Sequence, residues 1–282
     1  MDVGSSKILA IDLDGTLLGP DRQIGASDSA ALDLVVKAGM KVIIATGRSL
    51  YSARPVLKTI PVPVYVTLHN GALTIDPSGT ELWRETIKPE AATAAIIAMK
   101  NSGLHPMMYT GNVCGIEDGA ALFMEDLAYE SLYSRSYLDT KKEILKVVDD
   151  LSLVNHEEVL EIVSFGTEPI VQSTLMAITP LKKSLTSWYG PTEKFSIKLL
   201  EVVSPTATKG QAVQRIVEQL KMTPKDVIAI GDNNNDIDML KYAGTAIAMG
   251  NATHNVRTAA HFITTSNSSA GVARAIKEIG IL

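Results

Sequence analysis

Cysteine is nearly absent from this chain, which has one thiol, Cys114, in 282 residues. A single cysteine excludes an intrachain disulfide and fits a cytoplasmic protein, because thiols stay reduced in that compartment. Its neighbours Val113 and Gly115 offer no base that would activate the thiol. We therefore expect Cys114 to be a small packed residue and not a nucleophile.

Long basic runs and long apolar runs are also missing. No run of positive charge exceeds two lysines and the formal net charge is −5, so we expect no nucleic-acid partner. No apolar stretch reaches the length of a membrane span, and the first apolar run ends in acids, so we expect neither a signal peptide nor a membrane partner. The length suits one large domain or two modest ones.

A short apolar stretch at residues 8–11, ILAI, predicts a buried central strand that ends on two acids, Asp12 and Asp14. A carboxylate at the end of a buried strand is costly unless it is paired or coordinated. Ligands bind at the carboxyl ends of parallel strands, and Gly15 lets a ligand approach the backbone. The pattern indicates a site for a hard cation and an anion. The alternative is a plain turn, with Asp12 capping the strand and Asp14 in the turn.

Buried strands followed by polar residues are predicted again both near the start of the chain and near its end. Further buried strands are predicted at residues 41–45, 62–68 and 227–230, with helices between them, the first of which begins at a Ser27 N-cap. This order predicts an α/β fold with a doubly wound parallel sheet. Each of these strands is followed by polar residues or glycine: Thr46 and Arg48 after the first, Asn70 and Gly71 after the second, and Asp232, Asn235 and Asp236 after the third. Lys209 begins the helix that precedes the last of these strands.

The middle of the chain has a different pattern. After a hairpin over residues 72–86, its helices and strands predict an antiparallel sheet with helices packed on it. We expect a discontinuous core at 1–87 and 203–282 and an inserted α+β module at 88–202. Within the module, helices are predicted at 90–100, 122–133, 141–151 and 169–178, and strands at 105–110, 113–117, 160–165, 184–188 and 195–202.

The acids at the strand ends indicate metal-assisted phosphoryl chemistry. Asp12 and Asp232 would repel each other unless a divalent cation lay between them, and a few oxygen ligands with several waters favour Mg²⁺. A phosphate group fits beside the ion, bound by Lys209, the Thr46 hydroxyl and backbone N–H groups near Gly15.

A carboxylate that attacks phosphorus forms an aspartyl-phosphate and splits hydrolysis into two in-line steps. We assign Asp12 as the nucleophile because it lies deepest in the strand. Asp14 would protonate the leaving oxygen and later take a proton from the attacking water.

Four motifs together resemble motifs one to four of the haloacid dehalogenase (HAD) phosphatase superfamily, most closely its Cof-type, class IIB members. They are DLDGTLL at 12–18, ATGR at 45–48, Lys209-Gly210, and GDNNNDIDM at 231–239. HNGA at 69–72 is similar to the Asn-Gly-Ala that these relatives carry after the third strand. The resemblance implies a Rossmann-like core and, at 88–202, a mobile cap domain that closes over the site and helps to select the substrate.

The resemblance also implies roles for single residues. Mg²⁺ would be held by the Asp12 and Asp232 carboxylates and the Asp14 backbone carbonyl, with Asp236 supporting the ion's waters. Thr46, Lys209 and Asn235 would bind the phosphoryl group, and Arg48 would reach the substrate phosphate. The residues lining the substrate site would include Gly15, Asn70 and Gly71. Alternatives stay open for three residues: Thr46 as a strand-end cap, Arg48 paired with a surface acid, and Asn70 in a left-handed turn.

We expect a Mg²⁺-dependent phosphomonoesterase that acts on a small phosphorylated metabolite, with sugar phosphates as the first class to test, and that is a monomer or small homo-oligomer. A phosphomutase with the same aspartyl-phosphate chemistry is one alternative. A phospho-signalling module is another, although such domains are much shorter and carry the phosphorylated Asp on a later strand.

Overall fold

The computed structural model describes residues 8–111, 120–126, 132–191 and 197–280, so Cys114 and the strand expected at 113–117 lie outside the described residues. Contacts divide the chain into two compact units. The first unit comprises Met1–Ser49, Ala53–Trp83 and Thr208–Leu282, and the second comprises Leu50–Ser52 and Arg84–Ala207. The sequence placed the two boundaries a few residues away, at 87/88 and 202/203.

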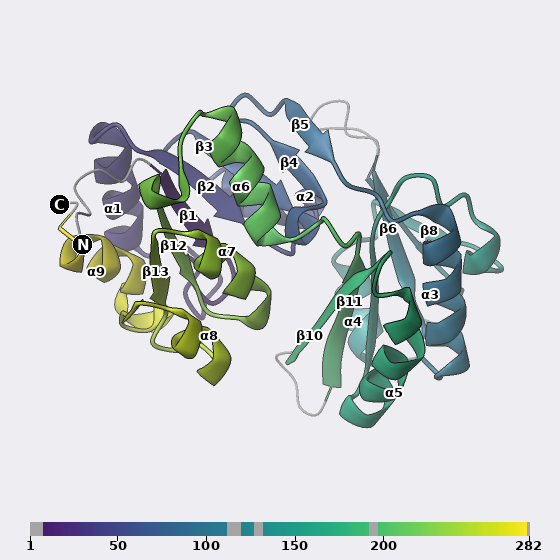
Figure 1. The fold of residues 1–282 in the computed structure, drawn as a ribbon. Coiled ribbons are helices and arrows are strands. Elements are labelled where there is room, and N and C mark those ends of the chain that lie inside the picture. The colour runs from purple at the N-terminus through teal and green to yellow at the C-terminus, as the bar shows by residue number, and fades with distance from the viewer. Residues whose placement is uncertain (1–7, 112–119, 127–131, 192–196, 281–282) are drawn as a thin grey trace. The chain divides into compact units, whose positions relative to one another are not determined.

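An eight-stranded sheet forms the centre of the first unit (Figure 1). In spatial order its strands are β14 (Phe262–Ile263), β13 (Thr245–Ala248), β12 (Val227–Gly231), β1 (Ile8–Asp12), β2 (Lys41–Ala45), β3 (Val64–Leu68), β4 (Leu73–Ile75) and β5 (Glu81–Arg84). The pairs from β14 to β3 are parallel, and β4 is antiparallel to β3. Strands β1 and β12 are buried along their whole length, which explains their continuous apolar sequences. The expected Rossmann-like α/β core is confirmed.

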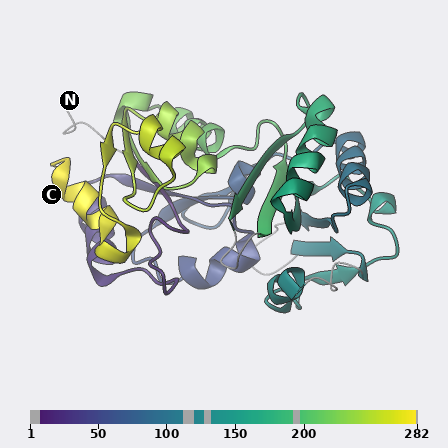
Figure 2. The ribbon, with the colours of Figure 1, turned by 90° about the horizontal axis from the view of Figure 1, so that it is seen from below.

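Helices cover both faces of this sheet (Figure 2). Helices α1 (Ala26–Lys37) and α9 (Gly271–Glu278) pack together on one face, and α6 (Lys209–Gln219), α7 (Ile237–Tyr242) and α8 (His254–Ala259) lie on the other. Helix α2 (Leu50–Leu57) connects β2 to β3. The predicted Ser27 N-cap is wrong: α1 begins at Ala26, its N-cap is Gly25, two residues before Ser27, and no side chain caps it.

Asp28 of α1 holds the start of α9. The N-cap of α9 is Ala270, which has no side-chain acceptor and a left-handed backbone with φ +51°. Buried Asp28 supplies the missing acceptor, since its Oδ1 receives the Ala273 N–H at 2.7 Å. Burial raises the pKa of Asp28, and the backbone N–H bonds partly offset this effect. A tertiary contact thus replaces a local helix cap.

We expect Asp28→Ala to lower the free energy of unfolding by about 1–2 kcal/mol, because it leaves the partly buried Ala273 N–H without an acceptor. Urea denaturation measures the change. The matched control is Asp33→Ala on the same helix, where an exposed pair with Lys37 is worth at most about 0.5 kcal/mol. Equal losses in the two variants would contradict the role given to Asp28.

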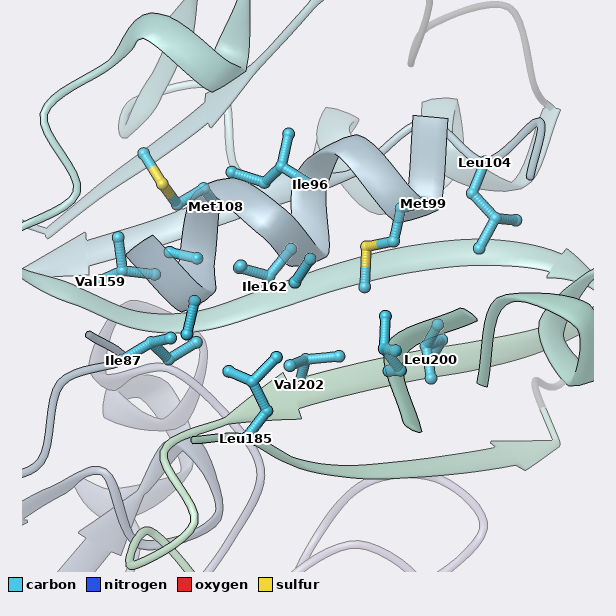
Figure 3. Packing of buried hydrophobic residues seen from close by; sticks show 14 of the residues in the cluster. Ile87, Ile96, Met99, Leu104, Met108, Val159, Ile162, Leu185, Leu200 and Val202 are labelled. Carbon is cyan, nitrogen blue, oxygen red and sulfur yellow. The ribbon is translucent and has the colours of Figure 1, made fainter. Parts of the chain in front are cut away.

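In the part of the chain that the structure describes, the second unit contains a six-stranded sheet with helices packed on it. In spatial order its strands are β10 (Thr186–Pro191), β11 (Ile197–Val203), β9 (Val159–Thr167), β6 (Met107–Gly111), β7 (Ala120–Met124) and β8 (Leu145–Val147). Helices α3 (Pro89–Asn101) and α5 (Glu168–Ile178) pack on one face, with Ile96 and Met99 against Ile162 and Leu200 (Figure 3). Residues that alternate with these on the strands, such as Met107 and Val163, pack with α4 (Leu132–Asp139) in a separate cluster.

Two helices predicted in this unit are wrong in whole or in part. Residues 122–124 belong to β7, and residues 141–151 contain no α-helix but a turn, β8 and the start of a 3-10 helix, Leu151–Leu153. Strand β7 packs against apolar residues on both faces, because Leu122 belongs to one cluster and half-buried Phe123 packs against the other, so its sequence shows no alternation. Among the described residues, no helix is long and apolar enough to cross a membrane.

Candidate active site

The candidate site lies in the first unit, at the carboxyl ends of β1 and β12. Strand β1 has β12 on one side and β2 on the other. The connection after β1 leads to β2 and the connection after β12 leads to β13, so the two run in opposite directions. Doubly wound sheets bind ligands at such a point. Asp12 is the last residue of β1, and Asp232 follows the last residue of β12. One carboxylate oxygen each of Asp12, Asp232 and Asp236 lie within 4.8 Å of one another.

Lys209 is the cation of this cluster. It is the first residue of α6, its side chain is 1% exposed, and its Nζ donates to Asp12 Oδ1 and to Asp236 Oδ1, each at 2.6 Å. Burial alone would lower the pKa of Lys209, but the charges of Asp12 and Asp236 outweigh it and raise the pKa above its ordinary value. The ammonium group therefore stays charged at neutral pH.

Among the described residues, one ammonium group contacts this cluster and does not balance the charge of its three carboxylates. Burial and then the charge of Asp236 raise the pKa of Asp12 well above its usual range, although Lys209 opposes this shift. The same two causes raise the pKa of Asp232 to about 6. Both shifts indicate a missing positive charge, and a donor set of oxygen atoms alone suits a hard divalent cation.

Asp236 fixes the turn that carries Asp232. Its Oδ2 accepts the backbone N–H groups of Asp232 at 3.0 Å and of Asn233 at 2.9 Å, and its Oδ1 accepts from Lys209. Both oxygens are therefore hydrogen bonded to the protein, and the side chain joins the end of β12 to the start of α6.

Asp14 lies at the exposed side of the site, paired with Arg48. Its side chain is 52% exposed, and the guanidinium binds it in bidentate fashion, with Nε 2.7 Å from Oδ2 and Nη2 2.5 Å from Oδ1. Such planar pairs are the strongest ion pairs that arginine makes. Arg48 is thus paired with an exposed acid, and that acid is the expected proton donor.

The loops after β2 and β3 bind each other through the backbone. The carbonyl of Thr46 accepts from Asn70 N at 3.1 Å, and the carbonyl of Arg48 accepts from His69 N at 3.0 Å. Buried Thr46 also accepts the Arg48 N–H on its hydroxyl oxygen at 3.1 Å, as expected of a strand-end cap. Its hydroxyl proton remains available for a further acceptor.

Asn70 is in the left-handed conformation, with φ +56°, which agrees with the turn left open as an alternative for this residue. Its Oδ1 accepts from Asn235 Nδ2 at 2.8 Å, which joins the loop after β3 to the loop after β12. Position 71 requires glycine, because φ is +114° there and a Cβ would lie 2.5 Å from the carbonyl oxygen of Thr208, next to Lys209.

Comparisons with known proteins agree with this geometry. A family model described as haloacid dehalogenase-like hydrolase matches residues 9–276. The chain belongs to this family. It is 28% identical to Phosphatase YwpJ of Bacillus subtilis (strain 168), with 97% of this chain and 99% of that protein covered. It is 29% identical to HMP-PP phosphatase of Cronobacter sakazakii (strain ATCC BAA-894), with 88% and 85% covered.

Among solved structures, the HAD subclass IIB sugar phosphatase BT4131 has the same fold, with a TM-score of 0.77 and 23% identity over 98% of this chain and 100% of that one. The expected fold and enzyme class are confirmed: the chain is an HAD-type phosphatase, a phosphoric monoester hydrolase.

Sequence reasoning missed three polar residues of this HAD site. Thr16 Oγ1 donates to Asp232 Oδ1 at 2.8 Å, and Asn251 Nδ2 donates to the Gly15 carbonyl at 2.8 Å. Asp238 Oδ2 accepts the Gly210 N–H at the start of α6, at 3.0 Å. Thr16 and Asp238 lie within the motifs DLDGTLL and GDNNNDIDM, which could have pointed to them, whereas Asn251 lies in none of the four motifs.

Proposed function

We propose that this HAD phosphatase hydrolyses the phosphomonoester of a small metabolite, using Mg²⁺ and a phosphorylated Asp12. One observation carries the proposal: three carboxylates and a buried ammonium group meet at the end of β1, and the strand's last residue, Asp12, lies within 2.6 Å of Lys209 Nζ. That arrangement presents a carboxylate oxygen beside positive charge, which in-line attack on a phosphoryl group requires.

Asp12 and Asp232 would hold the metal ion together with the Asp14 backbone carbonyl, while Asp236 would support its waters. When bound, Mg²⁺ would supply the positive charge that the cluster lacks and neutralise charge on the phosphoryl oxygens. Lys209, the Thr46 hydroxyl and backbone N–H groups near Gly15 would bind the same oxygens from the protein side.

In the first step an Asp12 oxygen forms a bond to phosphorus as the ester P–O bond breaks, and Asp14 gives its proton to the leaving oxygen. In the second step Asp14 takes a proton from water, the water oxygen bonds to phosphorus, and the Asp12–phosphorus bond breaks. Asp14 has to leave its pair with Arg48 to do this. Arg48, once released, would bind the substrate phosphate, with Asn70, Gly71 and Asn235 lining the same site.

The second unit, residues 88–202 by the sequence boundaries, would act as the cap that selects the substrate. The relatives include an HMP-PP phosphatase and a sugar phosphatase, so the family core is compatible with different small phosphate esters. We propose sugar phosphates as the first class to test.

Phosphate release from panels of sugar phosphates, nucleotides and cofactor phosphates, with and without Mg²⁺, tests the proposal. We expect Mg²⁺-dependent release of free phosphate from at least one small ester. An isomerised product without free phosphate would indicate a phosphomutase, and a phospho-enzyme that persists for minutes would indicate a signalling module. Either result would overturn the proposal.

Mg²⁺ affinity should depend on pH through Asp232, whose pKa is about 6. Because the ion requires ionised carboxylates, affinity is expected to fall at least about tenfold per pH unit below about pH 6, and more steeply where Asp12, whose pKa is also raised, is protonated as well. Titration calorimetry measures this, and an affinity that is constant from about pH 5 to about pH 8 would contradict it.

The metal-free protein should show the opposite trend in stability. Because folding raises the pKa of Asp232 above its ordinary 3.8, the stability that its protonated form contributes is complete below that value. It is lost as the pH rises through about 6, and Mg²⁺ should restore it. Urea denaturation without metal provides this second readout.

A further inference from the structure

Asn251 makes three polar contacts from a loop that crosses the end of β12. Its Nδ2 donates to the Gly15 carbonyl at 2.8 Å and lies 3.5 Å from Asp232 Oδ2. Its Oδ1 accepts the Asn267 N–H at 3.0 Å. The loop itself is bound to the same strand end, since Thr253 N donates to the Asp232 carbonyl at 3.1 Å.

These partners allow only one orientation of the Asn251 carboxamide. The two N–H bonds of Nδ2 face two acceptors, the Gly15 carbonyl and the Asp232 carboxylate, and Oδ1 faces a donor. A rotation by 180° would place the amide oxygen against both acceptors and the NH₂ group against an N–H. The amide therefore acts as a fixed bridge between the turn after β1 and the end of β12.

The two parts that the bridge joins approach each other closely. Gly15 has φ +85°, and a Cβ on it would lie 2.5 Å from Asp232 Oδ2. Thr16 Oγ1 holds the other oxygen of the same carboxylate at 2.8 Å. Each oxygen of Asp232 thus has a donor nearby, one from the turn itself and one from Asn251.

We propose that Asn251 is a positioning residue of the ion site. It fixes the Gly15 turn against Asp232 so that β1 and β12 present their carboxylates to one divalent cation, an inference that rests on the proposed function. Side chains that orient metal ligands commonly change metal affinity about 10–100-fold when they are removed. Among the described residues, the side chain of Asn251 makes no hydrogen bond to Asp12 or Lys209, so its effect should fall on the ion.

The test is direct titration of the metal-free protein with Mg²⁺ by calorimetry, for wild type, Asn251→Ala and Asn251→Asp. The Asp variant keeps the shape and the acceptor for Asn267 N–H but loses both donors. Asn155→Ala is the matched control, because Asn155 is an exposed residue of the second unit whose side chain also accepts a backbone N–H. Phosphate release at rising Mg²⁺ concentrations gives a second readout.

We expect Mg²⁺ affinity to fall about 10–100-fold in both Asn251 variants and to stay unchanged in the control. At saturating Mg²⁺, kcat should remain within about threefold of wild type, a split that general unfolding would not produce. Tighter binding in Asn251→Asp would show that added negative charge matters more than position and would overturn the proposal, as would wild-type affinity in Asn251→Ala. If the wild type itself binds no Mg²⁺, the proposed function fails first.

Discussion

Asn in place of Asp12 is expected to reduce phosphate release by at least about 10⁴-fold while the protein stays folded. An amide oxygen is a poor nucleophile towards phosphorus, so no phospho-enzyme forms. The fold should tolerate the change, because the amide is neutral and nearly isosteric, and Lys209 keeps its contact with Asp236. Rates of phosphate release and circular dichroism together measure the two expectations.

Asp14→Asn should also abolish turnover of ordinary esters but fail at a different step. With p-nitrophenyl phosphate, whose leaving group needs no proton, the first step should survive and the second should stall. We expect a burst of about one nitrophenol per site and an accumulated phospho-enzyme, which Asp12→Asn cannot give. Asp33→Asn, on the exposed face of α1, is the control for both variants. Full activity in either variant would break the assignment of roles.

Lys209→Met should be the most damaging change outside the acids. It removes the only ammonium group that binds Asp12 and Asp236 among the described residues, and it leaves these buried carboxylates without compensation. Removing one partner of a buried ion pair typically costs about 3–5 kcal/mol of stability. The loss of a phosphate-binding charge should lower kcat/KM by about 10²–10³-fold.

The stability loss in Lys209→Met should shrink as the pH falls. Protonation of Asp12 and Asp232 removes the negative charges that the lysine balanced, so the free energy of unfolding should approach that of wild type at low pH. Denaturation at several pH values measures this trend. Lys225→Met, an exposed lysine before β12, is the control. A loss that is independent of pH would contradict the electrostatic account.

Strand ends made much of the site predictable from the sequence. Asp12, Thr46, Asn70 and Asp232 each follow a buried apolar stretch, and a parallel sheet necessarily brings such positions to one edge. The second unit was harder because pairing between distant strands determined its structure. Strand β8, for example, forms only by pairing with β7, while its sequence spacing fits a helix.

Contacts between side chains could not be predicted in the same way. The bidentate pair of Asp14 with Arg48 joins residues 34 positions apart, and the bridge from Asn251 to Gly15 spans 236 positions. Sequence order indicates which residues reach the same edge of the sheet, but the turn geometry at Gly15 decides which atoms meet. The Asp28 contact with α9 has the same origin, since it compensates for a helix start that lacks its own cap.

A crystal structure of the protein with Mg²⁺ and trifluoroberyllate tests the central claim most directly. The account predicts a beryllium adduct on an Asp12 carboxylate oxygen and one ion in contact with both Asp12 and Asp232. An adduct on Asp14, or an ion that contacts only one of the two strand ends, would contradict it.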